Sequence, residues 1–435
     1  MKKIGIISLG CDKNRIDTEK MLGYLKDSDY VITDDIQDAE IIIINTCAFI
    51  EKARKESIDT ILDTVSLKDQ KCEKIIVSGC LSQKYLNDLT KELPEVDAFI
   101  GTSNYSDIVK IIDKLYNGEH YYNNIPKDSD STERILTTPR HYAYLKIADG
   151  CDNRCTFCAI PDIRGKYQSR TKENILKEAQ NLADMGVKEI LLVAQDTGRY
   201  GTDMYQDYSI TNLMYDLTKI DGVEWIRLLY CYPETITDEL LTLMVNEPKI
   251  CNYLDIPLQH IDDTILKRMN RHITEDGIKN LIKKIRKAGD ISIRSSFILG
   301  FPQETEEQFQ KLLKFLEEYK LDNVGFFTYS KEEGTPASKM DGQIPAKEKN
   351  RRLRAAAAVQ QKAVLENNKK YLGQTLSVLY EGIDYKRNLF YGRTQYNAPD
   401  VDTTVYFSGK FADIGKFYDV KITDILTYDL KGEIQ

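Results

Sequence analysis

Three short apolar runs, each ending in a cysteine, do most to constrain how the first third of this chain can fold. The runs occupy residues 4–10, 41–46 and 75–79 and lead to Cys11, Cys47 and Cys80. Short isoleucine-rich runs, each followed by a helix-like stretch, predict strands buried on both faces of a parallel sheet. Ligands gather at the carboxyl ends of such strands, so we expect the three thiols to converge. A buried cysteine can also be a small core hydrophobe, but three at equivalent strand ends favour a shared site.

A second cysteine trio lies within a single short loop. Cys151, Cys155 and Cys158 stand in the sequence Gly-Cys-Asp-Asn-Arg-Cys-Thr-Phe-Cys. Three such thiolates can hold three corners of a [4Fe–4S] cluster and leave the fourth iron open for another ligand. A zinc site is the alternative, but it needs a fourth Cys or His, and none follows within ten residues of Cys158. We interpret both trios as cluster sites with one open iron each.

The remaining cysteines fit neither trio. Cys72, Cys231 and Cys251 are interpreted as reduced core or surface thiols, since nine cysteines is an odd number and the first residues do not resemble a secretory signal. A reducing cytoplasm is expected, because thiolate-bound iron suits such a compartment. No apolar run approaches the roughly 18 residues of a membrane span.

The length of 435 residues exceeds what one hydrophobic core supports, so several domains are expected. We predict a Rossmann-like α/β domain at 1–125, a second domain at 137–368 and a third at 370–435. The polar, turn-rich stretch 117–140 suits a linker between the first two. The net charge of −8 favours a basic partner over a nucleic acid.

The second domain alternates strand-like and helix-like segments. Strands are predicted at 144–148, 189–194, 225–229, 252–256, 292–299 and 323–327. Helices are predicted at 172–185, 238–245, 276–287 and 304–319, and a charged helix at 346–370 leads out of the domain. Six strands with crossovers predict an incomplete TIM-type (β/α)6 barrel whose active site opens at the carboxyl ends of the strands.

The third domain changes to short alternating strands. They are predicted at 375–380, 389–393, 403–407 and 418–425. Strands of this length, separated by turn residues, predict a small closed all-β barrel of the oligonucleotide-binding type. The chain contains neither a P-loop nor a dinucleotide-binding G-x-G-x-x-G fingerprint.

Together these features resemble the radical S-adenosylmethionine (SAM) methylthiotransferase family over essentially the whole chain. In that family the three-cysteine domain precedes a radical SAM barrel and a terminal TRAM barrel. Within it, the chain is similar to the branch that modifies an aspartate of small-subunit ribosomal protein S-twelve. The motifs that carry this likeness are 8–14, 158–165, 194–201, 332–336 and 392–402. Asp12, Asp400 and Thr403 depart from the Pro, Glu and Gly that are usual in the branch.

The resemblance implies two [4Fe–4S] clusters and SAM in two roles, as methyl donor and as radical source. One SAM would methylate sulfur held at the Cys11/Cys47/Cys80 cluster. A second would be cleaved at the cluster of the loop trio to a 5′-deoxyadenosyl radical, which would take a hydrogen from the aspartate β-carbon. An electron donor is therefore needed. No catalytic residue beyond the cluster ligands is expected, because this C–H bond has no acidity for a general base to exploit.

Four further residues are predicted to contact SAM. Phe157 stands where the superfamily has an aromatic near the adenine. Gln195 ends a barrel strand and would meet the methionine amino group, while Arg294 would pair with the methionine carboxylate. Gly300 belongs to a strand-and-turn that runs alongside SAM in the superfamily and permits close backbone approach. Ordinary polarity at barrel ends explains Gln195 and Arg294 equally well.

The predicted substrate follows from charge as well as resemblance. Residues 371–435 contain nine Asp and Glu against seven Lys and Arg, whereas an RNA-binding barrel should be basic. An acidic barrel suits ribosomal protein S-twelve or the small ribosomal subunit, with Asp400 and Asp402 as docking contacts. Direct nucleic-acid binding is not expected to dominate, and no membrane is expected as a partner. The alternatives are a tRNA adenosine methylthiotransferase and, more remotely, a non-catalytic iron–sulfur electron carrier.

Overall fold

The three apolar runs that end in cysteine form the centre of a six-stranded parallel sheet, ordered β2-β1-β3-β4-β5-β6. The computed structural model describes residues 1–125, 131–410 and 412–435, so the middle of the predicted linker 117–140 lies outside the described residues. The strands are β1 (Lys3–Ser8), β2 (Val31–Ile32), β3 (Ile41–Thr46), β4 (Lys74–Gly79), β5 (Ala98–Ile100) and β6 (Tyr121–Asn123). The helices around them are α1 (Asp12–Lys26), α2 (Glu51–Val65), α3 (Cys80–Glu92) and α4 (Ile108–Tyr116).

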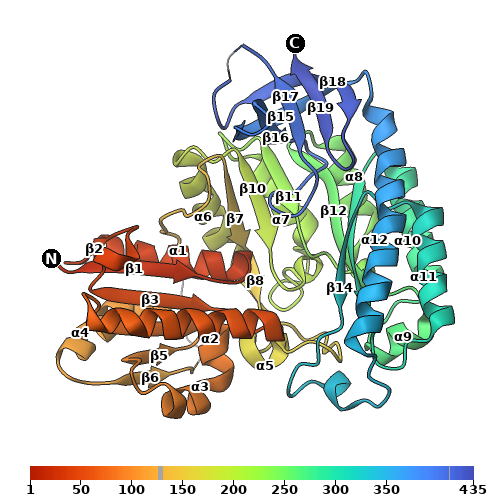
Figure 1. Ribbon diagram of the computed structural model, residues 1–435. Helices are drawn as coiled ribbons and strands as arrows, with labels where there is room; N and C mark the ends of the chain where they lie inside the picture. Colours follow the sequence, from red (N-terminus) through yellow and green to blue (C-terminus); the bar gives the residue numbers. More distant parts are fainter. Residues whose placement is uncertain (126–130, 411) are drawn as a thin grey trace.

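Both faces of this sheet are buried, which explains the unbroken apolar character of its central strands. Strand β3 is buried at all of its positions. Ile42 and Ile44 face a core shared with α2 and α3, whereas Ile41 and Ile43 face a core shared with α1 and α4. Strand β6 falls inside the predicted linker, because three residues are too few to show a strand pattern. Since the strands are parallel, their carboxyl ends all lie at one edge of the sheet. This edge faces the second sheet, in the middle of the molecule (Figure 1).

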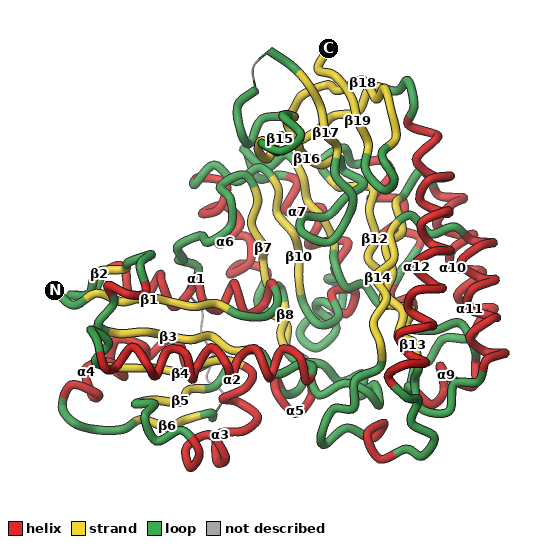
Figure 2. The backbone as a smooth tube through the Cα atoms, viewed as in Figure 1, coloured by secondary structure: helices red, strands yellow, loops and turns green. Residues whose placement is uncertain are grey.

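A second parallel sheet of six strands, ordered β14-β13-β12-β11-β10-β7, forms the middle of the molecule. It is an open, incomplete barrel, as predicted, with helices on its outer face (Figures 1 and 2). The strands are β7 (Tyr142–Lys146), β10 (Glu189–Val193), β11 (Trp225–Leu228), β12 (Ile250–Gln259), β13 (Ser292–Leu299) and β14 (Asn323–Thr328). The helices are α6 (Lys172–Asp184), α7 (Ile210–Thr218), α8 (Asp238–Asn246), α10 (Glu275–Ala288), α11 (Glu306–Tyr319) and α12 (Ala346–Asn368).

Several short elements of this part were not predicted. A two-stranded ladder pairs β8 (Ala148–Asp149) with β9 (Gln168–Ser169), and the loop between them carries the second cysteine trio. Helices α5 (Ile160–Arg164) and α9 (Asp263–Arg268) are short, and α7 was missed as well. One or two turns show no clear helical periodicity, which explains why α5 and α9 escaped the pattern. Among the described residues, no helix combines the length and apolar character that crossing a membrane requires.

The C-terminal residues close into a barrel of five strands, ordered β15-β16-β17-β19-β18. The strands are β15 (Thr375–Asp384), β16 (Leu389–Arg393), β17 (Val405–Ser408), β18 (Phe417–Ile425) and β19 (Leu430–Ile434). The closed barrel is confirmed, but the prediction of four strands misses β19, which pairs with both β17 and β18. Its sequence Leu-Lys-Gly-Glu-Ile is short and interrupted by Gly432, so its strand signal is weak.

This small barrel packs against the inner face of the open sheet. Alternate strand residues point inward there, and Leu191 and Tyr253 share a core with Leu379 of the small barrel. The ring of Trp225 meets that of Phe417 edge-on at 4.7 Å. The small barrel lies at the opposite end of the sheet from the cysteine loop (Figure 1). The end of the barrel that carries the cysteine loop is therefore the one available for chemistry.

The N-terminal sheet is held to the barrel through the segment after β14. Glu332 is 2% exposed and accepts hydrogen bonds from the backbone N–H of Glu51 at 2.9 Å and from Arg54 at 3.2 Å. Replacing Glu332 by alanine should lower the free energy of unfolding by about 1.5–3 kcal/mol, because hydrogen bonds to a buried charge are lost. Urea-induced unfolding would measure this loss. Glu333→Ala is the matched control, since that residue is exposed and, within the part of the chain that the structure describes, the hydrogen bond given for it is to its backbone carbonyl, from Lys84. An equal loss in both variants would contradict the prediction.

Candidate active site

The loop trio is held between β8 and α5. Cys151 and Cys155 are buried and Cys158 is partly buried. Burial raises the pKa of Cys158 to about 12, and the neighbouring thiols Cys155 and Cys151 contribute to the rise. The loop is fixed to the barrel, because the hydroxyl of Thr156 donates to the carbonyl of Arg268 at 2.7 Å. The trio therefore stands on a loop that is anchored to the scaffold.

The other trio comes together at the carboxyl edge of the N-terminal sheet. Cys11 precedes α1, Cys47 directly follows β3, and Cys80 opens α3 after β4. Burial raises the pKa of Cys80 to about 12, with Arg164 opposing the rise and Cys11 and Cys47 adding to it. At Gly10 an added Cβ would lie 2.8 Å from the Cβ of Cys47, so glycine permits this close approach.

The two trios differ from a mononuclear metal site. Among the described residues, no three His, Cys, Asp or Glu side chains are close enough together to hold a single metal ion. A four-iron cluster makes a different demand on its ligands, because each cysteine binds a different iron at a corner of the cluster. The donor set of each trio is three thiols, and thiolates are the ligands that iron–sulfur clusters prefer.

Helix α5 connects the two trios. It begins two residues after Cys158, and Ile163 near its end packs into the same core as Cys80. The next residue, Arg164, is 2% exposed along its side chain and donates to the sulfur of Cys80 at 3.8 Å. It also contacts Asp149 at 2.9 Å, two residues before Cys151. One short helix therefore carries contacts from the loop trio to the other trio.

Gln195 lies just beyond β10, at the carboxyl end of the barrel. Its amide Nε2 donates to Asp149 at 2.9 Å, which fixes the orientation of the side chain. Its Oε1 is buried and has no hydrogen-bond partner among the described residues. A buried amide oxygen without a donor costs free energy, so it marks a position where a donor group of a ligand fits.

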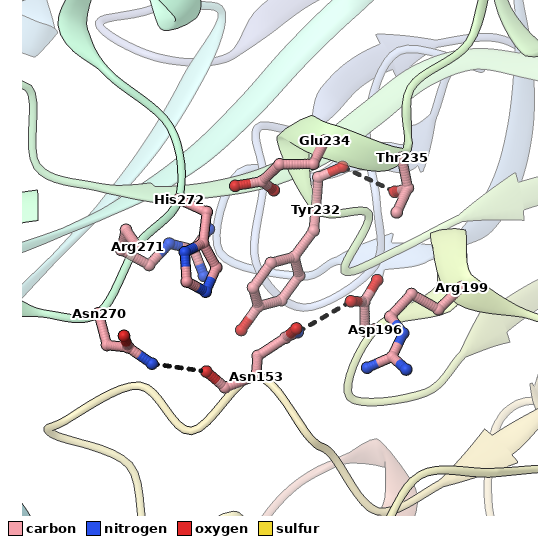
Figure 3. A pocket seen from close by; sticks show the side chains of 9 residues that line it. All are labelled: Asn153, Asp196, Arg199, Tyr232, Glu234, Thr235, Asn270, Arg271 and His272. Atoms are coloured by element: carbon pink, nitrogen blue, oxygen red, sulfur yellow. Dashed lines mark hydrogen bonds between the residues drawn. The ribbon is translucent and has the colours of Figure 1, made fainter. Parts of the chain in front are cut away.

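A polar cavity of about 130 Å³ lies beside the cysteine loop (Figure 3). The hydroxyl of Tyr232 and the guanidinium of Arg271 each lie 3.7 Å from the sulfur of Cys155. Arg271 also stacks on the Tyr232 ring at 4.0 Å, and Asn153 of the loop donates to Asp196 across the cavity at 2.9 Å. Tyr232 and Arg271 were missed by the sequence analysis, since nothing in their spacing connects them to the cysteines.

Two of the predicted SAM contacts line the barrel near the loop. Phe157 is partly buried and packs with Ile298 against a small apolar cluster that includes Phe301. Gly300 has a φ of +72°, a conformation that favours glycine. However, an added Cβ there would lie 2.4 Å from Cγ of Lys349 on α12. The close approach at Gly300 is therefore made by a side chain of the protein itself.

Arg294 and Asp402 pair with each other where the barrel meets the small barrel. Arg294 is near the amino end of β13, where it pairs with Asp255 at 2.9 Å and with Asp402 at 3.2 Å. The Asp402 side chain is fully buried and also accepts from Tyr253 at 2.6 Å. Both groups serve the contact between the barrel and the small barrel, and the Asp402 side chain is too deeply buried to form a docking contact. Asp400 is exposed and has a φ of +66°.

Three family models match the chain. The radical SAM superfamily matches residues 145–316, and the TRAM domain matches residues 372–434. The uncharacterized protein family UPF0004 matches residues 3–101, which include Cys11, Cys47 and Cys80. Each of the three sheets is thus covered largely by one family model.

Curated relatives are similar along the whole chain. A protein of Acetivibrio thermocellus is 46% identical over 445 residues, covering 100% of this chain and 98% of the relative. A protein of Clostridium novyi is 47% identical over 438 residues, covering 99% of this chain and 98% of the relative. Both are named ribosomal protein uS12 methylthiotransferase RimO.

Solved structures resemble the fold over much of the chain. The radical SAM methyltransferase TsrM from Kitasatospora setae, with cobalamin and a [4Fe–4S] cluster bound, matches with a TM-score of 0.57 at 12% identity, covering 77% of each chain. The cobalamin-dependent radical SAM enzyme OxsB, with aqua-cobalamin and SAM bound, matches with a TM-score of 0.55 at 14% identity, covering 83% of this chain and 56% of that one. At these identities the likeness concerns the fold alone.

Proposed function

The chain belongs to the RimO family of radical SAM methylthiotransferases, and from that premise we propose that it adds a methylthio group to the β-carbon of an aspartate in ribosomal protein uS12. The observation that carries the proposal is the pair of cysteine trios joined by α5. Helix α5 begins two residues after Cys158, and its last turn contacts Cys80. Two three-thiol sites connected in this way allow one chain to perform two linked reactions on one substrate.

The cofactors are two [4Fe–4S] clusters and SAM. We propose Cys151, Cys155 and Cys158 as ligands of one cluster, and the trio at the sheet edge, Cys11, Cys47 and Cys80, as ligands of the other. When bound, these cofactors supply the electron, the radical and the sulfur transfer that no amino-acid side chain can provide. Both donor sets fit, because thiolates are available and one coordination position on each cluster is left for a second ligand.

The side chains around the loop trio bind and orient. Asp149 fixes the amide of Gln195, so that Oε1 of Gln195 would accept a hydrogen bond from the amino group of SAM. Tyr232 and Arg271 present an O–H and an N–H to the sulfur of Cys155. We propose no general acid or base among them, because the aspartate β-carbon gives up a hydrogen atom and not a proton.

We propose uS12, free or within the small ribosomal subunit, as the protein partner, together with a separate electron donor. The small barrel supports this choice, because its acidic residues outnumber its basic ones and an RNA-binding surface should be basic. The test is a reaction of the anaerobically reconstituted enzyme with SAM, reductant and either purified uS12, small subunits or tRNA. Mass spectrometry should find one methylthio group on the uS12 peptide. Modification of tRNA adenosine, with uS12 unchanged, would assign the chain to the tRNA branch.

Asp400 is the acidic residue of the small barrel that we retain as a docking contact. Replacing Asp400 by asparagine should weaken binding of uS12 about two- to fivefold, because exposed ion pairs contribute about 0.2–1 kcal/mol. The affinity of the unchanged protein should also fall as salt is raised, since exposed charges are screened over about 8–10 Å. Titration of labelled uS12 at two salt concentrations measures both effects. Glu307→Gln, on the exposed face of α11, is the control, and an equal loss there would remove Asp400 from the interface.

A further inference from the structure

Arg164 contacts residues beside both cysteine trios, which the sequence did not predict. Its Nη1 donates to Asp149 at 2.9 Å, beside the loop trio. Its Nη2 donates to Asn14 at 2.8 Å, to Asp17 at 2.9 Å and to the sulfur of Cys80 at 3.8 Å, all on the N-terminal side. A single guanidinium therefore reaches both halves of the site.

The charges around Arg164 are balanced. Lys146 pairs with the same two carboxylates, with Asp17 at 2.6 Å and with Asp149 at 3.0 Å. Two cations and two carboxylates thus form a closed set, of which Arg164, Lys146 and Asp17 are each at least nine-tenths buried. Burying such a set rarely adds stability over an apolar core of the same shape. Its presence between two cofactor sites calls for a reason other than stability.

The contacts form a continuous path from one site to the other. Gln195, whose amide oxygen is buried without a partner among the described residues, is oriented by Asp149. Asp149 is held by Arg164, and Arg164 is held by Asn14, whose Nδ2 donates to the carbonyl of Thr46 at 2.8 Å. Thr46 directly precedes Cys47. The planar fork of arginine suits this path, because its five N–H groups point in fixed directions and lysine offers only a point charge.

We propose that Arg164 is a positioning residue that couples the two cluster sites, and that its N–H toward the sulfur of Cys80 raises the reduction potential of the cluster held by Cys11, Cys47 and Cys80. Hydrogen bonds to ligand sulfurs favour the more negatively charged, reduced cluster and so shift its potential upward. The same guanidinium holds Asp149, and through it Gln195, in a fixed position relative to Cys80. The measurement of coupling rests on the proposed function, because it needs the methylthiolated product. The measurement of the reduction potential does not, because it needs no substrate.

The potential is measured first, without substrate. In a Cys155→Ala background, which removes the cluster of the loop trio, spectroelectrochemistry followed by electron paramagnetic resonance reports the remaining cluster alone. Arg164→Gln should lower its reduction potential, and Arg164→Lys should lower it by a smaller amount, because lysine keeps the positive charge but loses the N–H directed at the sulfur of Cys80. Arg227→Gln is the matched control, since Arg227 is fully buried and pairs with Glu189 at 2.6 Å near the small barrel. It should leave the potential unchanged.

Coupling is measured second, in the otherwise unchanged enzyme with uS12. Arg164→Gln and Arg164→Lys should each lose about 10- to 100-fold of methylthio transfer, as expected for removal of an outer partner of a cluster ligand. 5′-Deoxyadenosine should still form, so its ratio to methylthiolated product should rise. If Arg164→Gln does not fold, coupling is measured in Arg164→Lys instead. A ratio of 5′-deoxyadenosine to methylthiolated product equal to that of the parent enzyme would then overturn the proposal. An unchanged potential and ratio in Arg164→Gln also overturn it. No product from the parent enzyme would instead contradict the proposed function.

Discussion

Replacing Cys47 by alanine is expected to abolish methylthio transfer while SAM is still cleaved to 5′-deoxyadenosine. Cys47 stands at the end of β3, in the trio at the sheet edge, and the loop trio is a separate set of ligands. Loss of one of three ligands should prevent the sulfur-delivering cluster from assembling, because the trio has no fourth cysteine to replace it. Chromatography of 5′-deoxyadenosine and mass spectrometry of uS12, from the same reaction, measure the two outcomes.

The matched control for Cys47→Ala is Cys72→Ala. Cys72 is also buried in the N-terminal part, in the same apolar core as Cys80, but its sulfur donates to the carbonyl of Lys74 at 3.5 Å and belongs to neither trio. This variant should retain both activities, apart from a modest loss of stability from the smaller side chain. If Cys47→Ala protein completes full turnovers, the sheet-edge trio is structural and the assignment of two clusters is wrong.

Replacing Cys155 by alanine is expected to remove SAM cleavage outright, and with it every product. Cys155 is the middle ligand of the loop trio and the sulfur that Tyr232 and Arg271 approach. The variant should keep its fold, since the loop is also fixed by Thr156 and Asn270. The measurement is 5′-deoxyadenosine formed with chemical reductant and SAM, with substrate absent.

The control for Cys155→Ala is Cys251→Ala. Cys251 is a fully buried thiol of the same barrel, in the core that faces the small barrel. Burial raises its pKa to about 12, with the charges of Arg227 and Glu189 acting on it in opposite directions. It should tolerate alanine without loss of cleavage. SAM cleavage by Cys155→Ala protein at the parent rate would show that the loop trio does not hold the cofactor that cleaves SAM.

Much of the fold follows from patterns that are local in the sequence. The runs before Cys11, Cys47 and Cys80 are strands of a parallel sheet because their isoleucines are buried on both faces. The order of strands and helices likewise predicts the open barrel. What the patterns miss is short. Helix α5 and strand β19 have too few residues to show a period, and their conformation depends on neighbours that are distant in sequence.

In the candidate site, too, some residues could be predicted from the sequence and others could not. The cysteines are recognisable because iron–sulfur ligation needs a rare residue in a fixed arrangement. Arg164 lies inside a motif that the sequence singled out, but three of its partners, Asn14, Asp17 and Cys80, come from the N-terminal part of the chain. Arg294 and Asp402 likewise have partners that are distant in sequence. A charge on a barrel strand looks like a ligand contact until its partner is known, and here Arg294 and Asp402 pair with each other across a domain contact.

The most direct test of the account is the metal content of anaerobically purified and reconstituted protein, measured by elemental analysis and Mössbauer spectroscopy. Two cluster sites should give about eight irons per chain, present as two four-iron clusters. Cys155→Ala and Cys47→Ala should each retain about four, held by the trio that is intact. Stoichiometric zinc without iron in the native protein would contradict this expectation. So would variants that both keep the full iron content of the parent protein.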